Sequence, residues 1–182
     1  MQAELSPDFF ARHSVIVARE LLGMYLLTAD CGGMIVEAEA YRQQDDPACH
    51  SFGGRQTRRN ASMFLSPGHL YVYRIHQVFC LNLTTEAAGL GCAVLIRALE
   101  PSAGIEAMLA RRQVKDPRQL TNGPGKLCQA LGIDLSWDSE PLGQHLRVED
   151  RGLRFADSEV AATGRIGISR GQELPWRFVL KS

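Results

Sequence analysis

The sequence lacks the cysteine patterns that staple small secreted domains or bind zinc. Its five cysteines, an odd number, contain no CxxC pair and stand at positions 31, 49, 80, 92 and 128. This argues against both a disulfide framework and a zinc ribbon, and it favours a reducing compartment. No other spacing of His, Cys, Asp or Glu matches a metal site, so we expect neither a metal nor another cofactor.

The sequence also lacks a long hydrophobic run and an excess of charge of either sign. No apolar run approaches the ~18 residues that cross a bilayer, and the N-terminal MQAELSPDFFARHS lacks the basic-then-apolar order of a signal peptide. We therefore expect an intracellular protein without a membrane partner, in the cytoplasm or nucleoid if the source is bacterial. The 20 Lys+Arg balance the 20 Asp+Glu. Because a polyanion site depends on where charges lie, this balance neither favours nor excludes nucleic acid.

What is present suits one compact domain. The 182 residues, 45% of them hydrophobic, are enough to form a single core, so we expect one domain over 1–182 and a monomer. Helical spacing and end signals predict helices at 7–10, 14–23, 102–112 and 124–131. Alternating or continuous apolar segments predict strands at 24–30, 34–41, 69–75, 78–85 and 91–99, followed by short strands in the C-terminal tail. This order predicts an α+β fold.

Two predicted hairpins enclose a long loop. In the first, DCGG (30–33) joins the strands, and we expect its glycines to supply the positive φ of a tight turn. In the second, His76 and Gln77 form an exposed tip. Residues 42–68, between the hairpins, have no periodicity, and a loop of this length inside a compact domain is usually functional or disordered.

The first candidate for chemistry is the strand MIVEAEAY. The two-residue period of a strand places Glu37, Glu39 and Tyr41 on one face, so two carboxylates become near neighbours. Such a pair can supply a general acid or base if the face is buried. For an isolated EAE, a solvated strand face is the favoured interpretation, and the strand alone leaves the catalytic interpretation open.

The second candidate combines aromatic and basic groups. Tyr71 and Tyr73 share a strand face, and residues 51–77 contain four arginines and no acid. Stacked aromatics beside a basic loop are typical of proteins that bind unstacked bases and phosphates, although paired core tyrosines give the same pattern. Cys49 and His50 are adjacent and point apart on extended chain, so they do not form a nucleophilic pair. GPGK (123–126) is too short for a P-loop, although its helix N-terminus can offer amides to one phosphate.

Six segments, taken in order, resemble the alkyladenine (3-methyladenine) DNA glycosylase family of the mammalian type. They are VEAEAY (36–41), HSFGGRQTRRNASMF (50–64), PGHLYVYRI (67–75), FCLN (79–82), LIRALEP (95–101) and GPGKLCQALGI (123–133). The resemblance is collinear and covers nearly the whole chain. It implies a curved, mostly antiparallel sheet with flanking helices and a protruding β-hairpin. It also implies a base-excision-repair enzyme that flips an alkylated or deaminated purine out of double-stranded DNA and hydrolyses its N-glycosidic bond.

The resemblance implies roles for particular residues. In catalysis, Glu39 matches the family's general base, Arg97 helps to position the attacking water, and Ile166 offers that water a backbone carbonyl. Four residues would line the pocket for the flipped base: Tyr41, His50, Tyr73 and Asn82. Six residues would contact DNA around the lesion: Arg55, Thr57, Arg59, Met63, His76 and Lys126.

One departure concerns the hairpin tip. The family generally carries a Tyr that wedges into the gap left by the flipped nucleotide, whereas this sequence has His76, on a hairpin about one residue shorter. This departure motivates an alternative, a non-catalytic module that binds damaged DNA or RNA. A third hypothesis, a glycoside hydrolase that uses Glu37 and Glu39, is weaker because carboxylates on one strand face do not flank a sugar ring from two sides.

Overall fold

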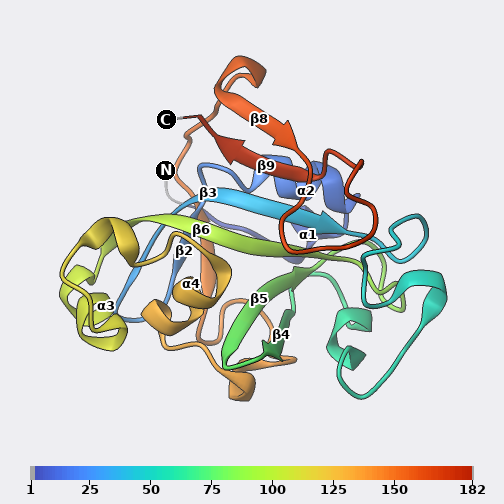
Figure 1. Cartoon of the computed structure of the whole chain (residues 1–182), viewed down its shortest axis with the longest axis horizontal. Helices are drawn as coiled ribbons and strands as arrows, with labels where there is room; N and C mark the ends of the chain where they lie inside the picture. The colour runs from blue at the N-terminus through green and yellow to red at the C-terminus, as the bar shows by residue number, and fades with distance from the viewer. Residues whose placement is uncertain (1–2, 182) are drawn as a thin grey trace.

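The computed structural model describes residues 3–181 and shows a curved antiparallel sheet flanked by helices (Figure 1). The strands of the described chain are β1 (Ala3–Glu4), β2 (Tyr25–Leu27), β3 (Gly32–Tyr41), β4 (Leu70–Ile75), β5 (Val78–Thr84), β6 (Ala93–Ala103), β7 (Arg147–Asp150), β8 (Val160–Thr163) and β9 (Arg177–Leu180). The α-helices are α1 (Pro7–Phe10), α2 (Ser14–Glu20), α3 (Ile105–Arg112) and α4 (Pro124–Leu131).

The sheet runs in the order β1-β7-β2-β3-β6-β5-β4; β9 pairs with β3 as its third neighbour, and β8 pairs with β9. All the strand pairs within residues 3–181 are antiparallel. In Figure 1, β8 and β9 lie at the top, the β4–β5 hairpin lies at the bottom, and α3 and α4 lie at one end. The predicted α+β fold, with a curved antiparallel sheet and flanking helices, is confirmed.

The long strand β3 is the centre of the sheet. Along one edge, its first half pairs with β2 and its second half pairs with β9, and β6 pairs along the opposite edge. Its Ile35, Ala38 and Ala40 belong to the main core, where Val17 and Leu21 of the α2 region are fully buried as well. Burial of each large aliphatic side chain contributes about 1.5–3 kcal/mol. Residues in the second half of β3 therefore have rigid neighbours on both sides.

The first hairpin forms, but its glycines have another role than the one predicted. Gly32 and Gly33 lie inside β3 and neither has a positive φ, while the turn is made by the preceding residues, where the Thr28 hydroxyl accepts from the Cys31 amide. A Cβ on Gly32 would lie 2.3 Å from the Leu26 carbonyl oxygen, and one on Gly33 would lie 2.2 Å from that of Glu100. Glycine is needed here because neighbouring backbones approach closely.

Two of the other predicted elements show how the ends of strands and helices are fixed. The predicted helix start at Ser102 is wrong, because β6 continues to Ala103 and α3 begins only after Gly104, which has φ 63°. The second hairpin is confirmed: its last pair is Ile75 with Val78, so that His76 and the residue after it form the exposed tip. The loop 42–68 contains only two short 3-10 turns, Phe52–Gly54 and Ala61–Phe64.

None of the helices in residues 3–181 has the length and apolar character needed to cross a membrane. The same part of the chain contains no group of three or more His, Cys, Asp or Glu side chains placed to hold a metal ion. Its five cysteines are all buried and unpaired.

Candidate active site

A row of side chains crosses the sheet in register. Glu39 of β3 is opposite Leu95 of β6, Leu95 is opposite Asn82 of β5, and Asn82 is opposite Tyr71 of β4. Residues directly opposite in antiparallel strands project to the same face of the sheet. The strand pairing therefore brings the Glu39 carboxylate, the Asn82 amide and the Tyr71 phenol onto one face of the sheet, although they are spread over a span of 44 residues.

Glu39 is fully buried, and both of its carboxylate oxygens accept hydrogen bonds. The amide of Ile166 donates to Oε1 at 2.9 Å, while the Tyr41 hydroxyl at 2.8 Å and Arg97 Nη1 at 3.3 Å donate to Oε2. Two carboxylate oxygens have about four acceptor positions, so these three donors leave capacity on Oε1 for one further donor such as water. A buried carboxylate whose orientation is fixed by hydrogen-bond donors is suited to act as a general base.

Arg97 joins the two carboxylates of the EAE segment. Its Nε donates to Glu37 at 2.7 Å, and the same Glu37 oxygen accepts from Arg177 Nε at 2.6 Å. The pairing of β3 with β6 skips Arg97, because Glu37 is opposite Ala98 and the next β3 residue is opposite Ile96. Bulges of this kind re-aim side chains next to active sites. Burial works against the guanidinium charge, but Glu39 and Glu37 outweigh it and raise the pKa of Arg97.

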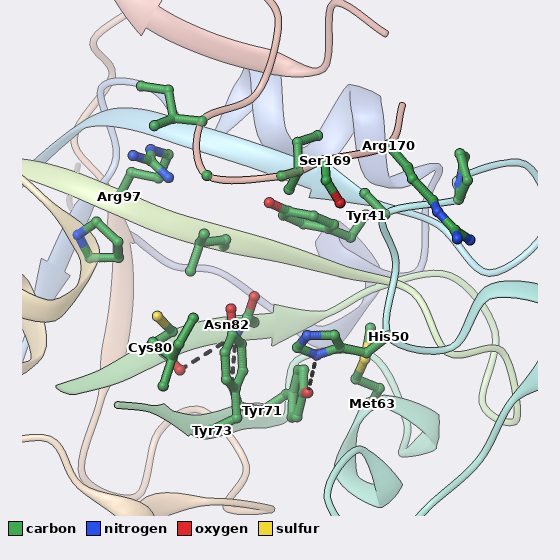
Figure 2. Close-up of a pocket in the computed structure, with 18 residues that line it drawn as sticks. Tyr41, His50, Met63, Tyr71, Tyr73, Cys80, Asn82, Arg97, Ser169 and Arg170 are labelled. Carbon is green, nitrogen blue, oxygen red and sulfur yellow. Dashed lines mark hydrogen bonds between the residues drawn. The ribbon is translucent and has the colours of Figure 1, made fainter. Parts of the chain in front are cut away.

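A cavity of about 460 Å³ opens beside this cluster. Figure 2 shows Tyr41 on one side of it and His50, Tyr71 and Tyr73 on the other. Arg97, Asn82 and Ile166 also line the cavity, but Glu39 does not, since it lies one layer behind Tyr41. The structure thus brings together the predicted pocket residues and places the predicted base directly behind them.

The aromatic wall is held by contacts among its own rings. His50 and Tyr73 meet edge to face with centroids 4.8 Å apart, and His50 Nδ1 lies 2.7 Å from the Tyr71 hydroxyl. The surrounding wall desolvates the His50 cation and Arg59 repels it, so the pKa of His50 is lowered. Burial raises the pKa of Tyr73 and of Tyr41, so both phenols stay neutral.

Asn82 and Met63 also line the cavity, and both are buried. Asn82 Nδ2 donates to the Tyr71 carbonyl at 3.0 Å and to the Cys80 carbonyl at 3.4 Å, which fixes the amide with Oδ1 as its free acceptor. Met63, predicted as a DNA contact, is only 2% exposed and packs in a small cluster with Tyr71, where it lines the cavity. Met63 therefore belongs to the lining of the cavity and not to the exposed surface.

A second cavity, of about 330 Å³, adjoins the first across His50 and Tyr71. Its lining contains no acidic residue and includes three arginines and a threonine: Arg55, Arg59, Arg170 and Thr57. Arg59 donates to a backbone carbonyl of the β4–β5 hairpin at 2.9 Å and lies 5.6 Å from the Tyr73 ring centroid. Since three cations without an acid attract phosphate, this cavity is a candidate site for the DNA backbone.

The remaining two predicted DNA contacts lie at the rim. His76 is exposed at the hairpin tip with φ 52°, and its carbonyl accepts from Arg74 Nε at 2.9 Å. Lys126 is exposed in the first turn of α4 and donates to Asn122 at 2.9 Å. Ile75, beside the tip, is 42% exposed and lines the mouth of the main cavity.

Sequence reasoning missed three residues near the site. Arg170 lines both cavities, and Arg165 forms a buried ion pair with Asp46 next to Tyr41. All three lie in loops, where neither periodicity nor a spacing rule applies. The available signal was the position of Arg165 next to Ile166, together with an acidic pair in the otherwise basic loop 42–68.

Comparisons with known proteins identify the family of this chain. Residues 8–182 match the family model described as Methylpurine-DNA glycosylase (MPG). A protein of Rhodopseudomonas palustris (strain HaA2) is 49% identical over 174 residues, covering 95% of this chain and 85% of its own length. One of Carboxydothermus hydrogenoformans is 45% identical over 184 residues, covering 98% and 95%.

Both relatives bear the name 3-methyladenine DNA glycosylase as a provisional assignment. Their organisms are bacteria, so the relatives support the family but not the mammalian type that the sequence resemblance carried. With nearly the whole length matched by the family model and by these relatives, the chain belongs to the methylpurine-DNA glycosylase family.

Proposed function

We propose that this chain is a monofunctional, purine-specific DNA N-glycosylase that acts as a monomer. Its family makes it a DNA glycosylase of base excision repair. The proposed reaction takes an alkylated or deaminated purine, flipped out of duplex DNA, and hydrolyses its N-glycosidic bond, leaving an abasic site. The observation that carries the proposal is the buried Glu39 carboxylate, held by three donors directly behind an aromatic cavity.

The cavity supports recognition of a flat base. Tyr41 on one side and His50 with Tyr73 on the other present ring faces and edges to a ligand between them (Figure 2). Flipping costs a few kcal/mol and costs least for a damaged base. A purine alkylated at N3 or N7 is cationic, so it gains from the aromatic rings and departs without an acid. In this assignment, Asn82 discriminates against the amino group of normal guanine.

Glu39 supplies the base for hydrolysis. A glycosidic bond breaks through an oxocarbenium-like sugar, which a carboxylate stabilises while it takes a proton from water. The water would donate to Oε1, the oxygen with spare acceptor capacity, and Ile166 would offer its carbonyl to the other proton. Arg97 holds the carboxylate in place from the cavity side. Glu37 faces the same arginine, so the two carboxylates do not enclose a sugar, which argues against a glycoside hydrolase.

The DNA backbone would lie across the acid-free cavity, with its contacts supplied by Arg55, Thr57, Arg59 and Arg170. Lys126 on α4 and His76 at the hairpin tip extend this surface to the far rim of the main cavity. Because the described site is built from one chain, a monomer supplies every group that the reaction needs.

The test is base release from a panel of duplexes, each with one modified base: 3-methyladenine, 7-methylguanine, hypoxanthine or an undamaged purine. We expect release of damaged purines, strand cleavage only after alkali, and no covalent adduct trapped by borohydride, because the nucleophile is water. Tight lesion binding without release from any duplex would identify a non-catalytic binding module instead. A trapped adduct would show that an amine of the protein attacks the sugar.

A further inference from the structure

A buried ion pair connects three walls of the main cavity. The side chains of Arg165 and Asp46 are both 0% exposed. Arg165 Nη2 donates to Asp46 Oδ1 at 2.6 Å, and Nη1 donates to Asp46 Oδ2. The same guanidinium donates to the carbonyls of Ala40 at 2.9 Å and Gly171 at 3.3 Å. Loss of one partner would leave an uncompensated buried charge, which is strongly destabilising. The pair therefore holds together the segments that it joins.

The first segment ends in Tyr41. The Arg165 guanidinium carbon lies 4.7 Å from the centroid of the Tyr41 ring. Tyr41 lines the cavity whereas Arg165 does not, so the guanidinium supports the ring from the side away from the cavity. The Tyr41 hydroxyl, oriented in this way, donates to Glu39 Oε2.

The second segment is the loop between β8 and β9, which passes over the end of β3 (Figure 1). Arg165 belongs to this loop, and its side chain fixes the loop through the bond to Asp46 and through the bond to the Gly171 carbonyl. Ile166, the next residue, donates its amide to Glu39 Oε1 at 2.9 Å. Arg165 thus acts on both oxygens of Glu39, on one through Tyr41 and on the other through Ile166.

The third segment is the start of the loop 42–68. Asp46 accepts from the amides of Ala48 at 2.9 Å and of Arg42 at 3.4 Å. These bonds shape the turn that leads to His50 on the opposite wall of the cavity. The ion pair therefore also connects the Tyr41 wall to the His50 wall.

We propose that Arg165, held by Asp46, is a positioning residue for the catalytic carboxylate. Its side chain is fully buried and does not line the cavity, so it acts through the segments that it joins, two of which hold the oxygens of Glu39. The proposal rests on the proposed function, since it concerns the rate of base release. Its signature is a split between two quantities: loss of Arg165 lowers the rate of the chemical step far more than it lowers the affinity for lesion DNA.

The test compares Arg165→Lys, Arg165→Met and the double variant Arg165→Met/Asp46→Asn with the wild type. The double variant removes both charges, so no buried charge is left unpaired. Asp150→Asn/Arg154→Met is the matched control, because it removes an exposed ion pair of 2.7 Å from the far end of the sheet. Single-turnover release from a 7-methylguanine duplex at saturating enzyme gives the rate of the chemical step. The same changes made in Glu39→Gln give the lesion affinity without turnover.

A misplacement of about 1 Å costs on the order of 10²-fold in rate. We expect release to fall about 100-fold in the double variant and about tenfold in Arg165→Lys, which keeps a cation beside Asp46 but loses the planar fork. Lesion affinity should change less than about threefold, and the control should match the wild type. Two results would overturn the proposal. One is an equal loss of rate and affinity, and the other is a release rate within twofold of the control for the folded fraction of Arg165→Lys or of the double variant. Absence of release from the wild type would refute the proposed function instead.

Discussion

Replacing Glu39 by glutamine changes the proposed base while nearly preserving its shape. The glutamine amide has one oxygen and one NH2 group in place of two acceptors. With the oxygen toward the Ile166 amide, the NH2 group faces the Tyr41 hydroxyl, which can accept a hydrogen bond, and Arg97 Nη1. Arg97 keeps its 2.7 Å bond to Glu37. The fold and the pocket should therefore survive the substitution.

The cost in stability follows from the bond that is lost. One hydrogen bond to a charged group contributes about 1.5–3 kcal/mol, and a domain of this length loses roughly 2–4 °C of Tm per kcal/mol. We expect Glu39→Gln to unfold roughly 3–12 °C below the wild type. Its affinity for lesion DNA should be unchanged, because Glu39 is not part of the cavity surface.

The cost in rate should be far larger. A positioned general base contributes roughly 10²- to 10⁴-fold, so single-turnover release of 7-methylguanine should fall by at least 10²-fold. Glu37→Gln is the matched control: its remaining oxygen can still accept from Arg97 and Arg177, but the negative charge beside both arginines is lost while Glu39 is kept, so it should lose similar stability and less than about tenfold in rate. Residual release by Glu39→Gln within tenfold of the wild type, at temperatures where it is folded, would refute the role of Glu39.

Three further predictions concern binding and pH. Lesion binding should weaken steeply with salt, and neutralising Arg55, Arg59 or Lys126 one at a time should reduce the log-log slope by about 0.9, measured by titration at several salt concentrations. His76→Tyr should tighten binding to lesion duplex, because a larger ring covers more of the neighbouring bases, while His76→Ala should weaken it and single strands should respond to neither; unchanged duplex affinities would remove His76 from the wedge. Folding lowers the pKa of His50, so as pH falls the unfolded chain takes up the imidazole proton before the folded chain does. The contribution of neutral His50 to the free energy of unfolding is therefore complete above pH ~6.5, and it is lost as pH falls toward the lowered pKa. Tm should therefore fall from pH 7 to 5 slightly more in the wild type than in His50→Gln, since His50 lies at an exposed rim.

Strand patterning could predict the sheet and the face that carries the site. The two-residue period placed Glu37, Glu39 and Tyr41 together, and the structure joins all three within one hydrogen-bonded group through Arg97. The period could not predict the bulge at Arg97, because a bulge depends on how two strands pair and not on either strand alone. Turn chemistry also misassigned Gly32, whose need for glycine comes from the close approach of a neighbouring strand and not from a positive φ.

The loops were beyond prediction for a related reason. Asp46 and Arg165 are 119 residues apart, and each belongs to a segment without periodicity. Their pairing is decided by where the ends of β3 and β8 bring the two loops, which is a property of the assembled sheet. The family resemblance supplied Ile166 and the pocket residues, but it gave no reason for a buried cation behind Tyr41.

The arrangement separates recognition of the base from the chemistry on the sugar. In the proposed mechanism, Tyr41, His50 and Tyr73 form the surface that meets the base, while Glu39 lies outside the cavity lining and is held by Tyr41, Arg97 and Ile166, which line the cavity. A base in the cavity therefore does not displace the donors that hold the carboxylate, and Glu39 keeps one orientation before and after binding. Substitutions of His50 and Tyr73 should then act mainly on which lesions bind, substitutions of Arg97 or Arg165 should act mainly on how fast any bound lesion is released, and substitutions of Tyr41 should affect both. Preorganisation of this kind lowers the barrier because no dipole has to turn when the proton moves.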